Sequence, residues 1–316
     1  MKKILKLFPF FLSLLLLFTA CSPKNKPQST KLKVIASLFP QYDFAKQIAK
    51  DKAEVTLLLP PGSESHTFDP STNDILKISN SDIFLYTGKY MEPWAERLLS
   101  GIDSSSLLIK DVSSNVNLLK ESHSEHEGED HADSSEHHHE HEYDPHFWLD
   151  PTLACVMVDN ILECFCTKDP DNAEFYKNNA EKIKNDLLKL DENISQTVKN
   201  AKRDTIVFAG KFAHLYFINR YNLKYEALIK NCSEQSEPSV QKITKVINFI
   251  KENNIPAVYY EELTMPTTAQ SICNNTNATA LRFNTIHNIS KEQLENNVSY
   301  MDLMNENLEN LKQGLN

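Results

Sequence analysis

Short apolar runs alternate with amphipathic segments in two stretches of the chain, one before residue 111 and one after residue 204. Runs rich in Val, Ile and Leu predict buried strands, and apolar residues that recur every three or four positions predict helices. In the first stretch the pattern predicts strands at 32–38, 55–59, 83–87 and 107–110, and helices at 41–50, from 71 onwards and at 92–99. Buried strands that alternate with helices indicate a parallel sheet covered by helices.

The second stretch repeats this alternation. Its strands are expected at 205–209, 224–229, 257–260 and 280–283, and its helices at about 214–220, 239–252, 267–274 and 291–312. The repetition predicts an α/β fold class with two separate strand–helix regions.

A long amphipathic segment separates the two stretches. A helix is expected at 152–166, then a break at an Asp-Pro-Asp sequence, then one helix from 172 to about 202. The apolar residues of the second helix recur at threes and fours and are Phe175, Ala180, Ile183, Leu187, Leu190 and Ile194. Such a helix can connect two lobes as a stiff spine or lie on the surface of one of them, and the periodicity fits both.

The first twenty residues have the composition of an export signal. Three lysines are followed by an apolar run at 7–18 and by small residues before Cys21. The run is too short for a membrane-spanning helix, which needs ~20 apolar residues. The sequence before Cys21 resembles a bacterial lipobox, although Phe18 occupies the position of the usual leucine. We therefore expect a lipoprotein signal peptide at 1–20, a lipid anchor on Cys21 and a flexible tether at 21–31.

Acidic residues and histidines concentrate in one low-complexity run at 121–142. The whole chain has a net charge of −10, and this run has no Lys or Arg and no apolar residue beyond alanine, so it cannot form a core. Its histidines are His123, His126, His131, His137, His138, His139 and His141. The run either binds divalent metals loosely through imidazole or serves as a solvated spacer. The negative charge and the expected export disfavour a nucleic-acid partner.

The cysteines give a weaker signal. Those after Cys21 are Cys155, Cys164, Cys166, Cys232 and Cys273. Their spacing matches no zinc ribbon. In an oxidising compartment a Cys232–Cys273 disulfide is one option, and the odd number leaves at least one thiol free within the chain.

The four remaining histidines lie near strand ends and turns. His66 follows a Pro-Pro-Gly turn, and His214 and His287 follow predicted strands of the second stretch. His146 lies in the sequence Asp-Pro-His-Phe-Trp-Leu-Asp-Pro at 144–151, where the two prolines restrict the backbone. Each histidine alone is also compatible with a hydrogen-bonded or solvated residue. Because sites in α/β sheets form beyond the carboxyl ends of strands, the four together predict a site in a crevice between two sheets.

These motifs, in this order, resemble those of the metal-binding solute-binding proteins of bacterial zinc and manganese ABC importers. The resemblance covers nearly the whole chain after the signal peptide and is most specific at 144–151. It implies two four-stranded α/β lobes at 32–170 and 204–316, joined by a rigid helix at 171–203, with a metal in the cleft between them. It also implies that His66, His146 and His214 are ligands, and it places His287 where relatives often have a carboxylate. Ile286 occupies a position where some relatives have a disulfide-bonded cysteine.

Neutral imidazoles suit Zn²⁺ better than Mn²⁺, which prefers oxygen ligands. We therefore expect a monomeric zinc receptor that delivers its ion to an ABC permease and its ATPase subunit at the membrane. A manganese receptor and a metal-dependent surface adhesin are the alternatives. A zinc hydrolase would need an open coordination position and a general base, and the chain has no HExxH helix. Glu64, Glu261 and Glu262 are candidates for such a base or for groups that orient ligating imidazoles.

Overall fold

The computed structural model describes residues 31–102, 105–120, 143–230, 238–263 and 265–316. The expected signal peptide, the anchor at Cys21, the tether up to residue 30 and the histidine-rich run at 121–142 lie outside the described residues. None of the helices in the described ranges is both long and apolar enough to cross a membrane. Residues 32–316 form one compact unit.

The first lobe is built on a four-stranded sheet in which all neighbouring strands run parallel, in the order β2-β1-β3-β4. Its strands are β1 (Leu32–Ala36), β2 (Ala53–Leu57), β3 (Ile83–Tyr86) and β4 (Leu108–Asp111). The helices between them are α2 (Phe39–Ala49), α3 (Thr72–Ser79) and α4 (Pro93–Leu99). Ser71 caps α3 through a reciprocal pair of hydrogen bonds with Asp74, as the sequence predicts.

The second lobe repeats this arrangement with the parallel order β6-β5-β7-β8. Its strands are β5 (Thr205–Lys211), β6 (Lys224–Ile229), β7 (Ala257–Tyr260) and β8 (Thr279–Arg282). Its helices are α7 (Leu215–Tyr221), α8 (Val240–Asn253), α9 (Thr267–Asn274), α10 (Lys291–Glu295) and α11 (Tyr300–Leu315). The prediction of two four-stranded parallel sheets with flanking helices is confirmed.

The prediction of one helix at 291–312 is wrong. Two helices, α10 and α11, occupy this part of the chain. Asn297, with φ at +54°, interrupts the helical backbone between them. Ser299 then starts α11, because its hydroxyl accepts from the backbone N–H of Asp302 and the Asp302 carboxylate accepts in return.

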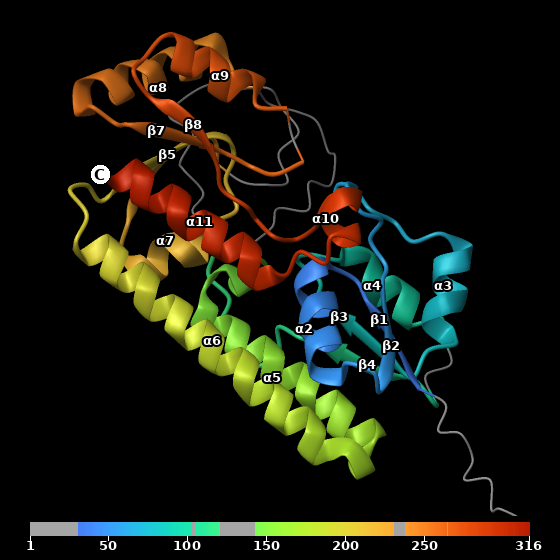
Figure 1. Cartoon of the computed structure of the whole chain (residues 1–316). Coiled ribbons are helices and arrows are strands. Elements are labelled where there is room, and N and C mark those ends of the chain that lie inside the picture. Colours follow the sequence, from blue (N-terminus) through green and yellow to red (C-terminus); the bar gives the residue numbers. More distant parts are fainter. Residues whose placement is uncertain (1–30, 103–104, 121–142, 231–237, 264) are drawn as a thin grey trace, which may run out of the picture. The chain divides into compact units, whose positions relative to one another are not determined.

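One hydrophobic core extends from the first sheet through α5 (Pro151–Lys168) and α6 (Ala173–Lys199) to the second sheet. Figure 1 shows α5 and α6 lying side by side. The helix α6 also packs against α2, and it contacts α7 and α11. Its buried face includes Ile183, Leu187 and Ile194, at the helical spacing that the sequence predicts. The single long helix therefore connects the two lobes, while the lobe boundaries at 170 and 204 stay a prediction.

The chain leaves β8 and crosses to the first lobe in a segment of six residues, 284–289, which we call the crossing segment. Trp148 donates from its indole to the Thr285 carbonyl at 2.9 Å. The backbone N–H of Phe39 donates to the His287 carbonyl at 3.2 Å, and that of Gly62 donates to the Ile289 carbonyl at 2.8 Å. The crossing segment therefore starts at the second sheet and is hydrogen-bonded to the first lobe.

Candidate metal centre

Three of the four singled-out histidines lie next to one another. The ring centroids of His66 and His146 are 5.5 Å apart, those of His66 and His287 6.1 Å, and those of His146 and His287 6.2 Å. Their positions in the sequence are separated by 80 residues or more. We call these three residues the histidine triangle.

A tight turn presents His66. Gly62 has φ at +82°, which is accessible to glycine at little cost, and Pro61 precedes it. The Ser63 N–H donates to the Pro60 carbonyl at 3.1 Å, closing a turn with proline second and glycine third. The Pro-Pro-Gly signal in the sequence thus sets the direction in which the chain approaches His66.

A buried carboxylate fixes His146. The Oδ1 atom of Asp144 accepts from the His146 backbone N–H at 2.7 Å and lies 2.9 Å from the ring Nδ1. His146 is fully buried, directly before the short 3₁₀ helix at Phe147–Leu149. Burial raises the pKa of Asp144 to about 7, and the backbone hydrogen bond from His146 opposes this shift. A proton on Nδ1 that bonds to Asp144 leaves the Nε2 lone pair available for a metal.

A second relay holds His287. The Thr285 hydroxyl lies 2.6 Å from Oε1 of Glu262 and 2.6 Å from Nδ1 of His287. Glu262 also accepts from the backbone N–H groups of Thr285 and Ile286. Because the hydroxyl has one hydrogen and donates it to the carboxylate, it accepts from Nδ1–H of His287. Nε2 of His287 is then the nitrogen available to a metal.

The backbone before His287 is unusual. Ile286 is fully buried and has φ at +64°, a region that β-branched residues rarely adopt. The carboxylate of Glu262 accepts the Ile286 N–H at 2.8 Å and stabilises this turn. The positive φ thus lies directly before the residue whose ring is 6.1 Å from that of His66 and 6.2 Å from that of His146.

His214 has a different environment. Its ring stacks on Phe208 with centroids 4.9 Å apart and meets the edge of Phe283 at 5.0 Å. Its Nε2 is 3.4 Å from the carbonyl of Asn284, and its buried Nδ1 has no hydrogen-bond partner among the described residues. Burial lowers the pKa of His214 to about 3, and positive charge on His146 adds to the shift. The ring is therefore neutral at ordinary pH, as a metal ligand must be.

Two of the candidate supporting carboxylates, Glu64 and Glu261, accept hydrogen bonds from backbone N–H groups. Oε1 of Glu64 accepts from the His66 backbone N–H at 3.1 Å, and Oε2 is 3.8 Å from Nζ of Lys211. Burial opposes the lowered pKa of Glu64, and the His66 N–H and nearby positive charges outweigh it. Glu261 accepts from the Lys211 N–H at 3.1 Å, and burial raises its pKa to about 7. Glu64 thus holds the backbone at His66 and Glu261 holds the end of β5, while Glu262 acts on His287 through Thr285.

The histidines are close to, but not in, a coordination geometry. Within the described part of the chain, no three His, Cys, Asp or Glu side chains are already arranged to hold a metal ion. Two imidazoles bound to one Zn²⁺ at ~2.0–2.1 Å have ring centroids roughly 5 Å apart. The triangle has separations of 5.5, 6.1 and 6.2 Å. Small side-chain movements would close the remaining difference.

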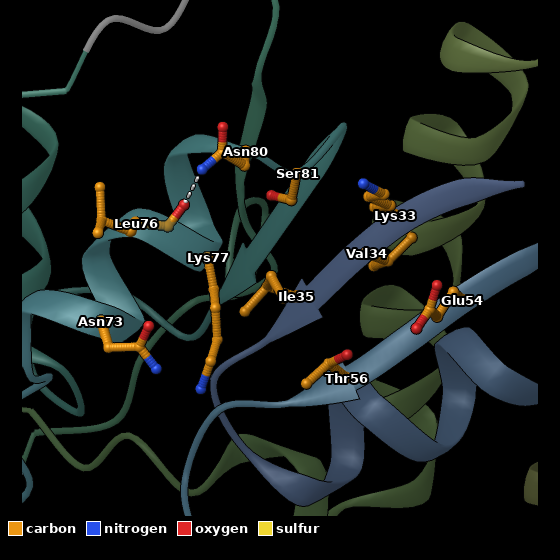
Figure 2. Close-up of a pocket in the computed structure, with 10 residues that line it drawn as sticks. All are labelled: Lys33, Val34, Ile35, Glu54, Thr56, Asn73, Leu76, Lys77, Asn80 and Ser81. Carbon is orange, nitrogen blue, oxygen red and sulfur yellow. Dashed lines mark hydrogen bonds between the residues drawn. The ribbon is translucent and has the colours of Figure 1, made fainter. Parts of the chain in front are cut away.

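A separate pocket of about 420 Å³ lies on the first lobe, between β1, β2 and α3. Figure 2 shows Lys77 of α3 extending beside Ile35 of β1. None of the four candidate histidines lines this pocket. It therefore contributes nothing to the candidate metal centre.

Sequence reasoning missed several residues that hold the candidate ligands. Asp144 is two positions before His146 in the most specific motif, so its Asp-Pro pair was an available signal. Thr285 lies two positions before His287 but belongs to no motif that marked it. Asn288 gave no signal, because its partners Pro60 and Ser63 are far away in the sequence. Cys155, Cys164, Cys166 and Cys273 are free thiols, which does not support a Cys232–Cys273 bridge, and Cys232 lies outside the described residues.

Two parallel sheets joined by a long helix, with histidines gathered where the chain crosses between them, define a two-lobed α/β protein of the solute-binding class. A family model described as zinc-uptake complex component A, periplasmic (ZnuA), matches residues 34–314, and the chain belongs to this family.

Individual relatives agree with this assignment. The chain is 34% identical over 305 residues to the high-affinity zinc uptake system protein ZnuA of Bacillus subtilis (strain 168), covering 95% of this chain and 94% of that protein. It is 31% identical over 301 residues to the zinc-binding lipoprotein AdcA of Streptococcus pneumoniae (strain R6), covering 95% of this chain and 59% of AdcA. This chain therefore spans only part of the length of AdcA.

Solved structures share the fold. The metal-dependent lipoprotein YcdH from Bacillus subtilis has a TM-score of 0.78 and 30% identity, over 90% of this chain and 100% of that one. The Zn(II)-bound ZnuA-like domain of Streptococcus pneumoniae AdcA has a TM-score of 0.76 and 27% identity, over 90% of this chain and 99% of that one.

Proposed function

We propose that this chain is the extracytoplasmic zinc-binding receptor of a high-affinity ABC metal importer. The observation that carries the proposal is the histidine triangle of His66, His146 and His287, whose ring centroids are 5.5–6.2 Å apart. In His146 and His287 the Nδ1 atom is occupied by Asp144 and Thr285, which leaves Nε2 for the ion.

In this proposal Zn²⁺ is cargo, bound by His66, His146, His214 and His287. Four imidazoles would complete a tetrahedral shell and leave no coordination position for a reactive water. An all-nitrogen shell favours Zn²⁺ over Mn²⁺, which prefers oxygen ligands. Membership in a zinc-uptake family and the names of the relatives support zinc as the ion.

The partners follow from the same proposal. A zinc-uptake component outside the membrane requires a permease and an ATPase subunit to move the ion inwards. A lipid anchor at Cys21 would hold the receptor at the membrane surface, with residues 22–31 as a tether. The lipoprotein names of two relatives support this anchoring. Mass spectrometry of membrane-extracted protein, compared with a Cys21→Ser variant, tests it: an unlipidated wild-type chain would contradict the anchor.

Metal analysis and calorimetric titration of the purified chain test the zinc proposal. We expect one tight equivalent of zinc in the wild type and its loss when all four histidines are replaced by alanine. Folding of the variant is checked by circular dichroism. A wild-type chain that binds zinc no more tightly than the folded quadruple variant would refute the proposal. Peptidase and esterase assays on the zinc-loaded protein separate a receptor from a hydrolase.

The histidine-rich run at 121–142 is proposed to hold additional, weaker zinc equivalents. Deleting residues 121–142 should leave the tight equivalent intact and remove only the weak ones in the same titration. The ends of the run suit such a deletion, because Lys120 and Tyr143 pair as an antiparallel bridge. Loss of the tight equivalent on deletion would place the main site in the run.

A further inference from the structure

Asn288 connects two segments that carry different members of the histidine triangle. It follows His287 directly and is fully buried. Its side-chain Nδ2 donates to the carbonyl of Pro60 at 2.9 Å and to that of Ser63 at 2.8 Å. Its Oδ1 accepts from the backbone N–H of Ile289 at 2.8 Å. The amide therefore uses both of its donors and its acceptor within the structure.

The two carbonyls that Asn288 binds belong to the turn that presents His66. The Pro60 carbonyl also closes that turn by accepting from Ser63 N–H, and Gly62 N–H donates to the Ile289 carbonyl at 2.8 Å. Three hydrogen bonds thus join the turn to residues 288–289. These hydrogen bonds fix the distance between the backbones of His66 and His287, although the bonded residues are more than 220 positions apart in the sequence.

The other end of the crossing segment is held from the second lobe. Glu262 accepts from Thr285 and Ile286, and the Thr285 hydroxyl bonds to His287 Nδ1. That relay sets the orientation of the His287 ring. Orientation alone does not fix the distance from His287 to His66, which needs a contact between their two segments. Asn288 is the side chain that supplies it.

We propose that Asn288 is a positioning residue of the metal site, which sets the spacing of His66 and His287 and thereby the preference of the site for a small tetrahedral ion. The proposal rests on the zinc-receptor function argued above. Mutation of a residue that hydrogen-bonds to a metal ligand typically lowers metal affinity 10–100-fold, because such residues hold the ligands in place. Asn288 acts on two ligands at once, through the turn and through its own backbone.

The test compares Asn288→Ala with a matched control, Asn160→Ala. Asn160 is also buried, and its Nδ2 also donates to two carbonyls, those of Val112 at 3.0 Å and Ser114 at 2.8 Å. Both variants remove one donor from each of two carbonyls, so both should lower the unfolding temperature of the metal-free protein. Asn288→Ser is a milder second variant, since its hydroxyl can donate to one carbonyl only.

Zinc affinity is measured for each variant by competition with a chromogenic chelator, and the visible spectrum of the Co²⁺-loaded protein reports coordination geometry. We expect roughly 10–100-fold weaker zinc binding for Asn288→Ala, a smaller loss for Asn288→Ser, and wild-type affinity for Asn160→Ala. The Co²⁺ spectrum and the ratio of Zn²⁺ to the larger Cd²⁺ affinity should change only in the Asn288 variants.

Two results would overturn the inference while the zinc-receptor function survives. One is wild-type zinc affinity and an unchanged Co²⁺ spectrum in the Asn288 variants. The other is an equal loss of zinc affinity in the Asn288 and Asn160 variants, which would show a general effect of stability. A wild-type chain without tight zinc binding would instead refute the function and this inference together.

Discussion

The histidine triangle and His214 differ in what surrounds them. Each triangle member has another imidazole as a ring neighbour, and His146 and His287 have a polar group on Nδ1. His214 instead stacks on Phe208 and meets Phe283, with its Nδ1 buried and unpaired. The triangle is thus polar and already gathered, while the fourth candidate ligand is packed in an aromatic environment at the second sheet.

This difference indicates how the site would be assembled. The backbone of every triangle member is part of the first lobe or hydrogen-bonded to it, because the His287 carbonyl accepts from Phe39 N–H. His214 precedes α7 and belongs to the second lobe. Zinc would therefore be held by three imidazoles hydrogen-bonded to or within the first lobe, and His214 would complete the shell from the other lobe. The unpaired Nδ1 of His214 is a buried polar atom that a metal ion would satisfy.

The largest expected effect separates His146 from His214. Replacing His146 with alanine should weaken zinc binding more than about 100-fold. The loss of a ligand that is fixed in place should exceed the 10–100-fold effect of losing a residue that only hydrogen-bonds to a ligand. Replacing His214 should cost only on the order of 10-fold, since three imidazoles and a water still form a tetrahedral shell. Chelator competition measures both. Equal losses in the two variants would contradict the distinction between the triangle and His214.

The next effect is the pH dependence of zinc affinity. An imidazole must be neutral to bind zinc, and free imidazole has a pKa of ~6.5, so protons in general compete with the metal as pH falls from 7 to 5. The pKa of His214 is lowered to about 3 by burial, so this ring stays neutral throughout that window. We therefore expect affinity to fall by on the order of 10–100-fold from pH 7 to pH 5. Calorimetric titration should give the same slope for His214→Ala; a flat wild-type profile would argue against imidazole ligands.

A smaller effect, on metal selectivity, is expected at His287, the triangle member that lies in the crossing segment after β8. His287→Asp would place a carboxylate beside His66 and His146. An oxygen ligand suits Mn²⁺ better, so the ratio of Zn²⁺ to Mn²⁺ affinity should fall, with roughly a 10-fold loss for zinc. Competition of the two metals in wild type and variant measures the ratio. If both zinc affinity and the ratio are unchanged, His287 is a turn residue outside the site.

Local patterns in the sequence predicted the fold better than they predicted the residues that hydrogen-bond to the candidate ligands. The strand β7 begins and ends where its apolar run does, because burial on both faces of a parallel strand leaves a continuous hydrophobic signal. The prediction of one helix at 291–312 was wrong, because Ser299 caps the start of a second helix. The signal for this start is the Ser-x-x-Asp sequence at 299–302, which lies inside a periodic segment.

The residues of the candidate site likewise fall into those that the sequence indicates and those that it does not. The four histidines could be singled out because they follow turns or strands, and Asp144 belongs to a motif that was in view. Asn288 could not be found, since its partners Pro60 and Ser63 precede it by more than 220 residues and meet it only in the folded chain. Glu262 was nominated as a neighbour of the ligands, but the Thr285 hydroxyl through which it acts on His287 is visible only in three dimensions.

The smallest effect concerns stability, where two buried groups, Glu92 of the first lobe and His214 of the second, should respond to pH in opposite directions. Glu92 of the first lobe is buried against Ser37 and the Thr87 N–H. Burial raises its pKa from 4.5 to about 8, so the folded state holds a proton that the unfolded state has lost. Its contribution is fully present below pH 4.5 and disappears as pH rises to 8. The pKa of His214 is lowered from 6.5 to about 3, so its contribution is present above pH 6.5 and is lost below it.

Glu92→Gln tests the first of these contributions. The neutral amide cannot ionise, so the variant should lose less stability than the wild type as pH rises from 5 to 8, by roughly 1 kcal/mol per pH unit at most. Urea unfolding of the metal-free protein at pH 5, 6, 7 and 8 gives the free energy of unfolding for both chains. The difference between them isolates Glu92 from His214 and from other titrating groups. Parallel curves would mean that Glu92 is ionised in the folded protein, and the expected contrast between Glu92 and His214 would then be contradicted.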